Sequence, residues 1–307
     1  YGGGAGGRYG GRGGLARVAA GQELDWSPPA SIAAGLAWLA TMQTAEGGIR
    51  GAGGRPEVEA TALTALALLG QGATMTNGDG HEVLSRCAGW LLAQQADDGG
   101  LAPQGAEQLR HHALATYALA EAYGLGFALN LRGGLQAALA WLGAQRQPDG
   151  GFGDALGTAT AVTAMVSAQF FKVGPPCEPK SVVAWFDTRP VQDDQTALAA
   201  ELLARAFVGQ SIKDLQVRTA ATRLLSATGA GEDPWLEFWA SHLAYQIGGD
   251  DWRGWMVRLR EIAQLQEKSE SASNGSWPAV GGRSQSVTTA LRVLSLEAMA
   301  RYTRMVR

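Results

Sequence analysis

The chain of 307 residues carries 25 basic and 28 acidic side chains, and 46% of its residues are hydrophobic. That apolar share is ample for a folded core, whereas a net charge of −3 without a basic cluster argues against a nucleic-acid surface. No uninterrupted apolar run reaches the roughly 18 residues of a membrane-spanning helix. Two cysteines, Cys87 and Cys177, are too few for a disulfide framework.

The first 27 residues differ in composition from the rest. Residues 1–14 contain nine glycines and almost nothing to bury, so we expect residues 1–27 to be a flexible linker or lead-in. An RNA-binding Gly/Arg segment is the alternative, which two arginines support poorly. A domain over 28–307 is expected to begin at Pro28-Pro29. Because the chain starts at Tyr1, we expect a piece of a larger protein. The sequence does not indicate its cellular compartment, and a signal or anchor upstream would make it extracytoplasmic.

Three amphipathic segments share one spacing. In each, a Trp stands nine residues before a Gly-Gly pair that an acidic residue precedes. The three are Trp38 with Gly47-Gly48, Trp90 with Gly99-Gly100, and Trp141 with Gly150-Gly151. The apolar spacing predicts helices, and Gly-Gly is typical of a helix C-terminus. We expect each Trp to pack beneath the Gly-Gly turn that follows it.

A second series of segments alternates with the first and is rich in Ala, Leu and small residues on every side, which is typical of helices buried all round. Their central residues are Thr61, His112, Thr160, Thr196, Ser241 and Thr289. We interpret this column as packing residues whose hydroxyls bond the preceding turn. The alternation predicts an all-α fold, a single closed (α/α)6 toroid of six outer and six inner helices.

The repeated Gln-x-x-Asp-Gly-Gly pattern resembles the QW repeat of squalene–hopene cyclases. It is best preserved in 95–101 and 149–153, with a worn copy at 274–277. The same α/α toroid occurs in protein prenyltransferase β subunits and in complement-type thioester domains. The resemblance spans about residues 30–305 and implies the toroid architecture rather than a particular reaction.

Class II terpene cyclases protonate an alkene with the middle Asp of D-x-D-D. The nearest segment here is Val191-Gln192-Asp193-Asp194, which lacks the first Asp. We interpret Asp193 and Asp194 as helix-capping acids, with a proton-donating or ligand-binding role as the alternative. Few aromatic residues on the inner segments could stabilise a carbocation. We therefore expect no squalene cyclisation.

Cofactor signatures are also missing from the sequence. Neither cysteine falls on an inner segment, so the prenyltransferase zinc site is not expected, and Gly-Cys-Gly-Glu-Gln of the thioester domains does not occur. A different zinc site from His112, His242 and Asp194 is conceivable by ligand type alone. We expect no cofactor and no metal.

A polar rim is predicted where the inner helices begin, because helix N-termini attract anions and pockets favour a polar rim over an apolar bore. Its positions are Glu59, Arg110, Thr158, Asp194, Trp239 and Val287. From this end the binding candidates are Glu59, Arg110, His112, Asp194, Trp239 and His242. An alternative places Glu59 and Asp194 across the ring from each other as the carboxylate pair of a glycosidase. The competing interpretation is that the two acids cap separate helices.

The function expected from these patterns is a non-cyclising toroid that acts as a binding or interaction module within a larger protein. Its expected partner is another protein or domain, or an apolar isoprenoid ligand. The alternative is an atypical enzyme on isoprenoid or carbohydrate substrates, with Asp193, Asp194 or Glu59 as catalytic candidates. A packed centre would favour the binding module, and a deep bore with a perturbed carboxylate would favour the enzyme.

Overall fold

The computed structural model describes residues 28–175, 177–189 and 193–301. The predicted linker 1–27, and Val191 and Gln192 of the D-x-D-D-like segment, lie outside the described residues. Within the described ranges the regular structure is helical, and the only strand-like features there are two isolated bridges, Gln43 with Ile49 and Arg50 with Pro56.

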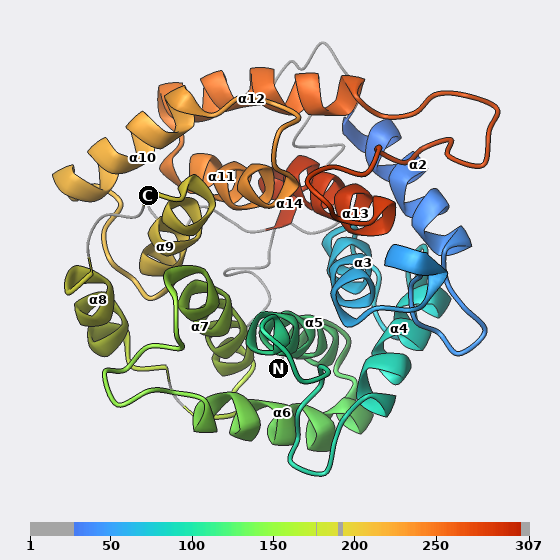
Figure 1. The fold of residues 1–307 in the computed structure, drawn as a ribbon, viewed down its shortest axis with the longest axis horizontal. Helices are drawn as coiled ribbons and strands as arrows, with labels where there is room; N and C mark the ends of the chain where they lie inside the picture. The colour runs from blue at the N-terminus through green and yellow to red at the C-terminus, as the bar shows by residue number, and fades with distance from the viewer. Residues whose placement is uncertain (1–27, 176, 190–192, 302–307) are drawn as a thin grey trace.

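Twelve helices of the described chain form two concentric rings (Figure 1). The outer ring consists of α2 (Pro28–Thr41), α4 (His81–Ala93), α6 (Arg132–Ala144), α8 (Pro179–Asp187), α10 (Leu215–Ala227) and α12 (Gly249–Gln264). The inner ring consists of α3 (Val58–Gly70), α5 (Gln108–Gly126), α7 (Ala155–Phe170), α9 (Gln195–Phe207), α11 (Pro234–Ile247) and α13 (Gln285–Leu296). A short α14 (Ala298–Arg301) and two 3₁₀ turns, Ala52–Gly54 and Leu129–Leu131, complete the set.

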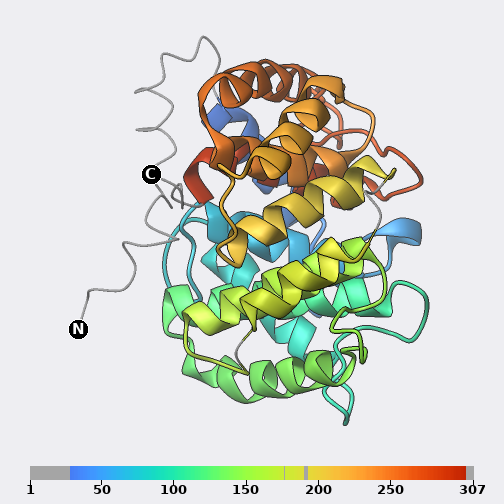
Figure 2. The same cartoon turned by 90° about the vertical axis from the view of Figure 1, so that its left-hand side faces the viewer.

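The ring is closed. Each inner helix packs on the next, and α13 packs on α3, while α12 and α2 bring the last and first outer helices together. Seen from the side, the inner helices run between the two ends of a thick disc (Figure 2). The predicted single toroid of six outer and six inner helices is confirmed.

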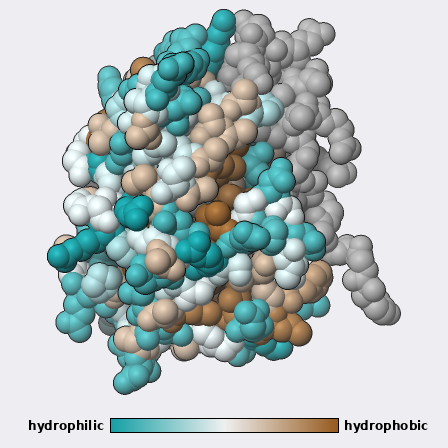
Figure 3. Space-filling model, turned by 90° about the vertical axis from the view of Figure 1, so that its right-hand side faces the viewer, coloured by the Kyte–Doolittle hydropathy of each residue, from teal (hydrophilic) through white to brown (hydrophobic). Residues whose placement is uncertain are grey.

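Residue size explains which helices lie inside. In α3 every residue except Glu59 is buried, because its Ala, Thr and Leu side chains allow neighbouring backbones to approach closely. Hydroxyls on inner helices bond the preceding turn, as Thr163 does to the Ala159 carbonyl at 2.8 Å. Outer helices bury one stripe only, and on the face drawn in Figure 3 hydrophilic residues are interspersed with less polar ones and a few hydrophobic clusters.

A glutamine hydrogen bond ties successive outer helices together. The Gln43 amide donates to the carbonyls of Gly47 and of Val83 in α4, both at 2.9 Å. The same arrangement recurs at Gln95 with Gly99 and Gly134, and at Gln266 with Gly275 and Ser31. Because Ser31 lies in α2, the last of these bonds closes the outer ring between its sixth and first members.

The prediction that each repeated Trp packs beneath the Gly-Gly turn that follows it is wrong. Trp90 packs on Gly48, the turn of the preceding repeat, and a Cβ at Gly48 would come within 2.7 Å of the Trp90 ring. Trp141 lies in the same way against Gly100, and Trp185 against Gly151. The broad indole fills the space between two neighbouring outer helices, and spacing along one helix cannot tell which flanking turn it reaches.

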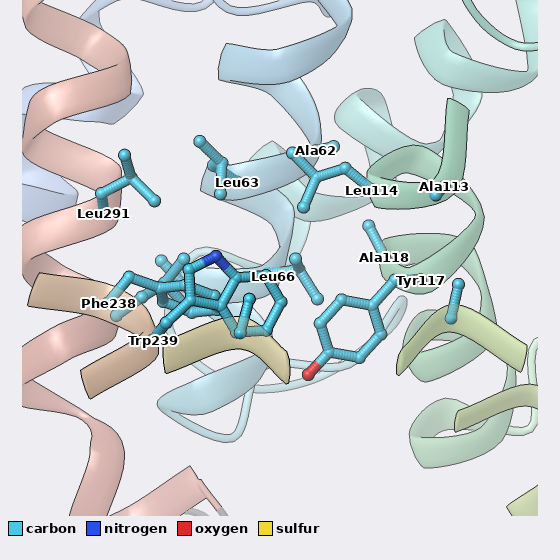
Figure 4. Packing of buried hydrophobic residues seen from close by; sticks show 14 of the residues in the cluster. Ala62, Leu63, Leu66, Ala113, Leu114, Tyr117, Ala118, Phe238, Trp239 and Leu291 are labelled. Carbon is cyan, nitrogen blue, oxygen red and sulfur yellow. The ribbon is translucent and has the colours of Figure 1, made fainter. Parts of the chain in front are cut away.

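Side chains fill the middle of the ring. Leu66, Tyr117, Phe238 and Trp239 converge there from three inner helices and are all buried (Figure 4). Two fully buried ion pairs accompany them, Glu237 with Arg292 at 2.9 Å and Glu121 with Arg301 at 2.7 Å. The centre is therefore a packed core rather than an open tunnel. None of the described helices is long and apolar enough to cross a membrane.

Candidate functional site

A cavity of about 380 Å³ opens where the inner helices begin, and we call it the mouth cavity. Its wall combines charged and aromatic side chains over an apolar base. The residues that line it are Glu59, Glu107, Arg110, His111, Leu114, Leu156, Thr160, Trp235, Gly282 and Arg283. The predicted polar rim at this end of the ring is thus where a cavity forms, and its size lies in the range of small-molecule pockets.

Glu59 is the most firmly held carboxylate of the mouth cavity. Its Oε1 accepts a hydrogen bond from Trp235 Nε1 at 3.1 Å, and its Oε2 lies 3.7 Å from His111 Nε2. Glu59 stands in the first turn of α3, where the helix dipole favours a negative charge. With 19% of its side chain exposed, Glu59 is fixed from two sides yet open to a ligand.

The start of α11 positions Trp235. Asp233 caps this helix by accepting the Trp235 backbone N–H at 3.0 Å, and Pro234 occupies the first turn, where a missing N–H costs nothing. The other Asp233 oxygen accepts the Thr196 hydroxyl at 2.9 Å, so α9 braces the cap. Arg283 adds a weaker contact to Asp233 at 3.7 Å.

The remaining charges of the mouth cavity form a second pair. Glu107 and Arg110 make an ion pair one turn apart at the start of α5. Both side chains are substantially exposed, at 49% and 34%, so solvent weakens their attraction and a ligand can compete for either group. The cavity therefore offers two carboxylates, Glu59 and Glu107, from neighbouring inner-helix starts.

A second cavity, of about 590 Å³, adjoins the first, and we call it the lateral groove. It shares Glu59 and His111 with the mouth cavity and extends outward between the turns of the first two repeats. Its other polar walls are Glu57, Gln94, Asp98, Gln104 and Gln108, with Trp90, Pro56 and Pro103 as apolar surfaces.

Glu57 at the groove wall is tuned towards its protonated form. Partial burial raises the pKa of its carboxyl, and the neighbouring Glu59 charge adds to the rise. The Ala52 backbone N–H, at 2.7 Å from Oε1, acts in the opposite direction.

The structure brings together only two of the predicted binding residues, Glu59 and Arg110, which line the mouth cavity. Asp194 caps α9, and its Oδ1 accepts the N–H groups of Thr196 at 2.8 Å and Ala197 at 3.3 Å, in agreement with the capping interpretation. Asp193 is exposed. Because neither aspartate lines the mouth cavity or the groove, the alternative of a Glu59–Asp194 pair across the ring does not form there.

The other three candidates lie in the packed core. Both ring nitrogens of His112 are engaged, Nδ1 by the Leu101 N–H and Nε2 by the Ala138 carbonyl, each at 3.0 Å. Burial lowers the pKa of His112 to about 4, so the imidazole is neutral near pH 7. Trp239 stacks beneath Trp235 with 6.2 Å between ring centroids, and His242 bonds the Phe238 carbonyl at 2.8 Å.

The conceivable zinc site from His112, His242 and Asp194 is not formed. Among the described residues, no three His, Cys, Asp or Glu side chains are grouped so as to hold a metal ion. His112 instead has a structural role that recurs in other repeats: a side chain of the inner helix accepts the backbone N–H of the residue just after the glycine turn of the same repeat. Thr61 and Thr289 do the same for Ile49 and Trp277.

In the third repeat Thr160 bonds the preceding turn, as the sequence predicts, and a different residue, Thr158, accepts the N–H that follows the turn. Thr158 accepts the Phe152 N–H at 2.9 Å, while Thr160 bonds the preceding turn of its own helix and lines the mouth cavity. The loop between the Gly-Gly pair and α7 is shorter than its counterparts, so the register moves by two residues.

Sequence reasoning missed Glu107, His111, Trp235 and Arg283. Trp235 directly follows Pro234 at a capped helix start, and His111 adjoins the rim position Arg110, so both carried a usable signal. Arg283 comes from the loop before α13, where the sequence shows no periodic pattern that would point to a site.

Comparisons with known proteins identify the fold. No family model and no curated protein matches the chain. An inactive variant of the α-1,6-mannanase GH76A of Salegentibacter sp. HEL1_6, in complex with α-1,6-mannotriose, matches with a TM-score of 0.65 at 12% identity, over 89% of this chain and 99% of that one. The type II terpene cyclase MstE from Scytonema gives 0.63 at 15%, over 89% and 98%.

An α-amylase from Clostridium perfringens gives a TM-score of 0.60 at 10% identity, over 90% of this chain and 99% of that chain. The fold is an α/α toroid. At such low identities the similarity extends to the fold alone, although these three neighbours are all enzymes.

Proposed function

We propose that this toroid is a carbohydrate-active enzyme that binds a glycan at the mouth cavity and hydrolyses a glycosidic bond there. The observation that carries the proposal is Glu59, a fixed and partly exposed carboxylate that shares the wall of a 380 Å³ cavity with Glu107. Most glycoside hydrolases use a pair of carboxyl groups, one as acid and the other as base or nucleophile.

The rest of the wall suits a sugar. Trp235 offers part of an aromatic face to the C–H side of a pyranose, while Arg110 and Arg283 can donate to its hydroxyls. Two solved neighbours are inactive variants of the mannanase with adjacent aspartates replaced, so carboxylates matter to that enzyme on this fold. In this chain the adjacent pair Asp193-Asp194 lies outside the cavity, and the proposed carboxylates are Glu59 and Glu107.

An isoprenoid substrate fits the structure less well. The centre of the ring is filled by Leu66, Tyr117, Phe238 and Trp239, so it leaves no open path for a long hydrocarbon chain. Most side chains that line the mouth cavity are charged or polar, and Trp235 is its one aromatic ring besides the imidazole of His111. We expect incubation with squalene or linear prenyl diphosphates to yield no cyclic product by mass spectrometry. Cyclic products that disappear in Asp194→Asn would instead establish terpene chemistry.

A non-catalytic binding module is the second candidate, because the packed centre is the feature expected of it. The decisive experiment incubates the protein with α-1,6-mannotetraose and with maltotetraose and follows shorter products by chromatography. We expect cleavage of one series, with at least a 100-fold loss in Glu59→Gln and in Glu107→Gln.

The matched control is Glu82→Gln, an exposed acid on α4 that lines neither cavity and should leave the rate unchanged. Binding without cleavage, measured by calorimetry and lost in Glu59→Gln, would assign the binding module. If neither series binds or is cleaved, the carbohydrate proposal is overturned.

A further inference from the structure

We propose that the ligand is an oligosaccharide that runs from the mouth cavity across Glu59 into the lateral groove, so that Glu59 lies beside a linkage inside the sugar chain. This inference rests on the proposed function and adds the length of the ligand and its path over the surface. It is carried by the geometry of two adjoining cavities with two wall residues in common.

The two cavities meet at Glu59 and His111. Both side chains line the mouth cavity of about 380 Å³ and also the lateral groove of about 590 Å³. Their contact, Glu59 Oε2 to His111 Nε2 at 3.7 Å, is longer than a normal hydrogen bond, and the two groups are 19% and 27% exposed. In the proposed path, a ligand that fills both cavities crosses this contact.

The lateral groove has the chemistry of a sugar site rather than an apolar slot. The amides of Gln94, Gln104 and Gln108 carry donors and an acceptor, which together match a sugar hydroxyl, and Gln94 keeps one weak bond to the Trp90 carbonyl at 3.3 Å. Gln108 keeps one weak bond to the Ala102 carbonyl at 3.3 Å, and Gln104 is exposed.

Cleavage at this position splits the chain internally. A water molecule gives its hydroxyl to the anomeric carbon and its remaining proton to one carboxylate, while the glycosidic C–O bond breaks and the departing sugar oxygen takes a proton from the other carboxyl group. One product then occupies the mouth cavity and the other the groove. The structure therefore predicts internal cleavage products rather than release of single terminal sugars.

A bulky side chain at the groove edge tests the path. Ala96 lines the groove, is exposed, and stands in the turn after α4, where its carbonyl accepts the Gly99 N–H. Gln147 occupies the same place in the next repeat, with the same bond to Gly150, and lines neither cavity. Ala96→Trp and Gln147→Trp are thus matched variants that add the same ring to equivalent turns.

The affinities of α-1,6-linked mannose and of α-1,4-linked glucose oligosaccharides with one to four units are measured by calorimetry. For the series that binds, we expect affinity to rise at least tenfold from one unit to four. Ala96→Trp should abolish that gain and leave the single sugar unaffected, while Gln147→Trp should behave as the wild-type protein.

Two other results are distinguishable. If single sugars bind in a Glu59-dependent way, but longer ones bind no better and Ala96→Trp changes nothing, the proposed function stands and the path through the groove is overturned. If no member of either series binds, the proposed function fails, and the inference falls with it. Melting temperatures of both Trp variants confirm that the fold is intact.

Discussion

The indole N–H of Trp235 donates to Glu59 Oε1 at 3.1 Å across the mouth of the ring. The two residues lie on α11 and α3, which α13 separates in the inner ring, and they are 176 positions apart in the chain. This bond fixes the carboxylate on which the proposed site depends. It also links two helices that are not direct neighbours.

A double-mutant cycle should measure this bond. Trp235→Phe removes the donor and keeps an aromatic ring, and Glu59→Ala removes the acceptor. We expect a coupling of about 1–2 kcal/mol in the free energy of unfolding, since hydrogen bonds to charged groups contribute roughly that much when partly buried. Urea denaturation of the four proteins gives the value. Strict additivity would mean that the two side chains do not interact in solution.

The contact of Trp90 with Gly48 predicts a specific dependence between two substitutions. Trp90→Ala should lose about 3–5 kcal/mol of unfolding free energy, the usual range for a large truncation in a core. Gly48→Ala should destabilise the wild-type protein by about 1–3 kcal/mol, because the new Cβ would lie 2.7 Å from the indole.

In the Trp90→Ala background, Gly48→Ala should cost clearly less, although Pro56 at 2.6 Å from the same Cβ keeps part of the penalty. Thermal denaturation of the four proteins provides the comparison. An equal cost in both backgrounds would show that Trp90 does not pack on Gly48 and would restore the turn that follows it as the partner.

The buried ion pair of Glu237 and Arg292 should be costly to break singly. Each side chain is 1% exposed, and Glu237 Oε1 also accepts the Gly231 N–H. Arg292→Met leaves an uncompensated buried carboxylate, and we expect a loss of about 3–5 kcal/mol. The double variant Glu237→Gln/Arg292→Met should recover a large part of it. Chemical denaturation tests this, and a double variant as unstable as the single one would contradict it.

His112 should make stability depend on pH. Its pKa falls from the usual 6.5 to about 4 in the folded protein, because burial disfavours the charged ring. The unfolded chain then binds more protons than the folded one between these values, so stability is full above about pH 6.5 and declines as the pH falls towards 4. The decline attributable to His112 is on the order of 3 kcal/mol for a lowering to about 4.

His112→Asn carries no titratable group, and its amide oxygen can still accept the Leu101 N–H. The difference in unfolding free energy between pH 7 and pH 4.5 should therefore shrink in this variant. His81→Asn, at the surface start of α4, serves as the control and should keep the wild-type difference. An unchanged pH dependence in His112→Asn would show that the imidazole is hydrated in solution.

The ring itself follows from local features of the sequence. Alternating amphipathic and all-apolar helices can bury their faces only in two layers, and the spacing of Trp38, Trp90 and Trp141 before glycine pairs marks where outer helices end. The rim at the inner-helix starts could likewise be placed in advance, and with it Glu59 and Arg110. Capping by Asp194 was predictable for the same reason, because it depends on residues within one turn.

Only the tertiary structure decided which residues form the site. Trp235, His111 and Glu107 meet Glu59 because ring closure brings separate inner-helix starts to one mouth, and no local pattern encodes such a distance. The same holds for Trp90, whose ring lies between two outer helices and packs on the turn of the preceding repeat. Periodicity determines which face of a helix is buried, whereas the partner of that face depends on how whole helices pack.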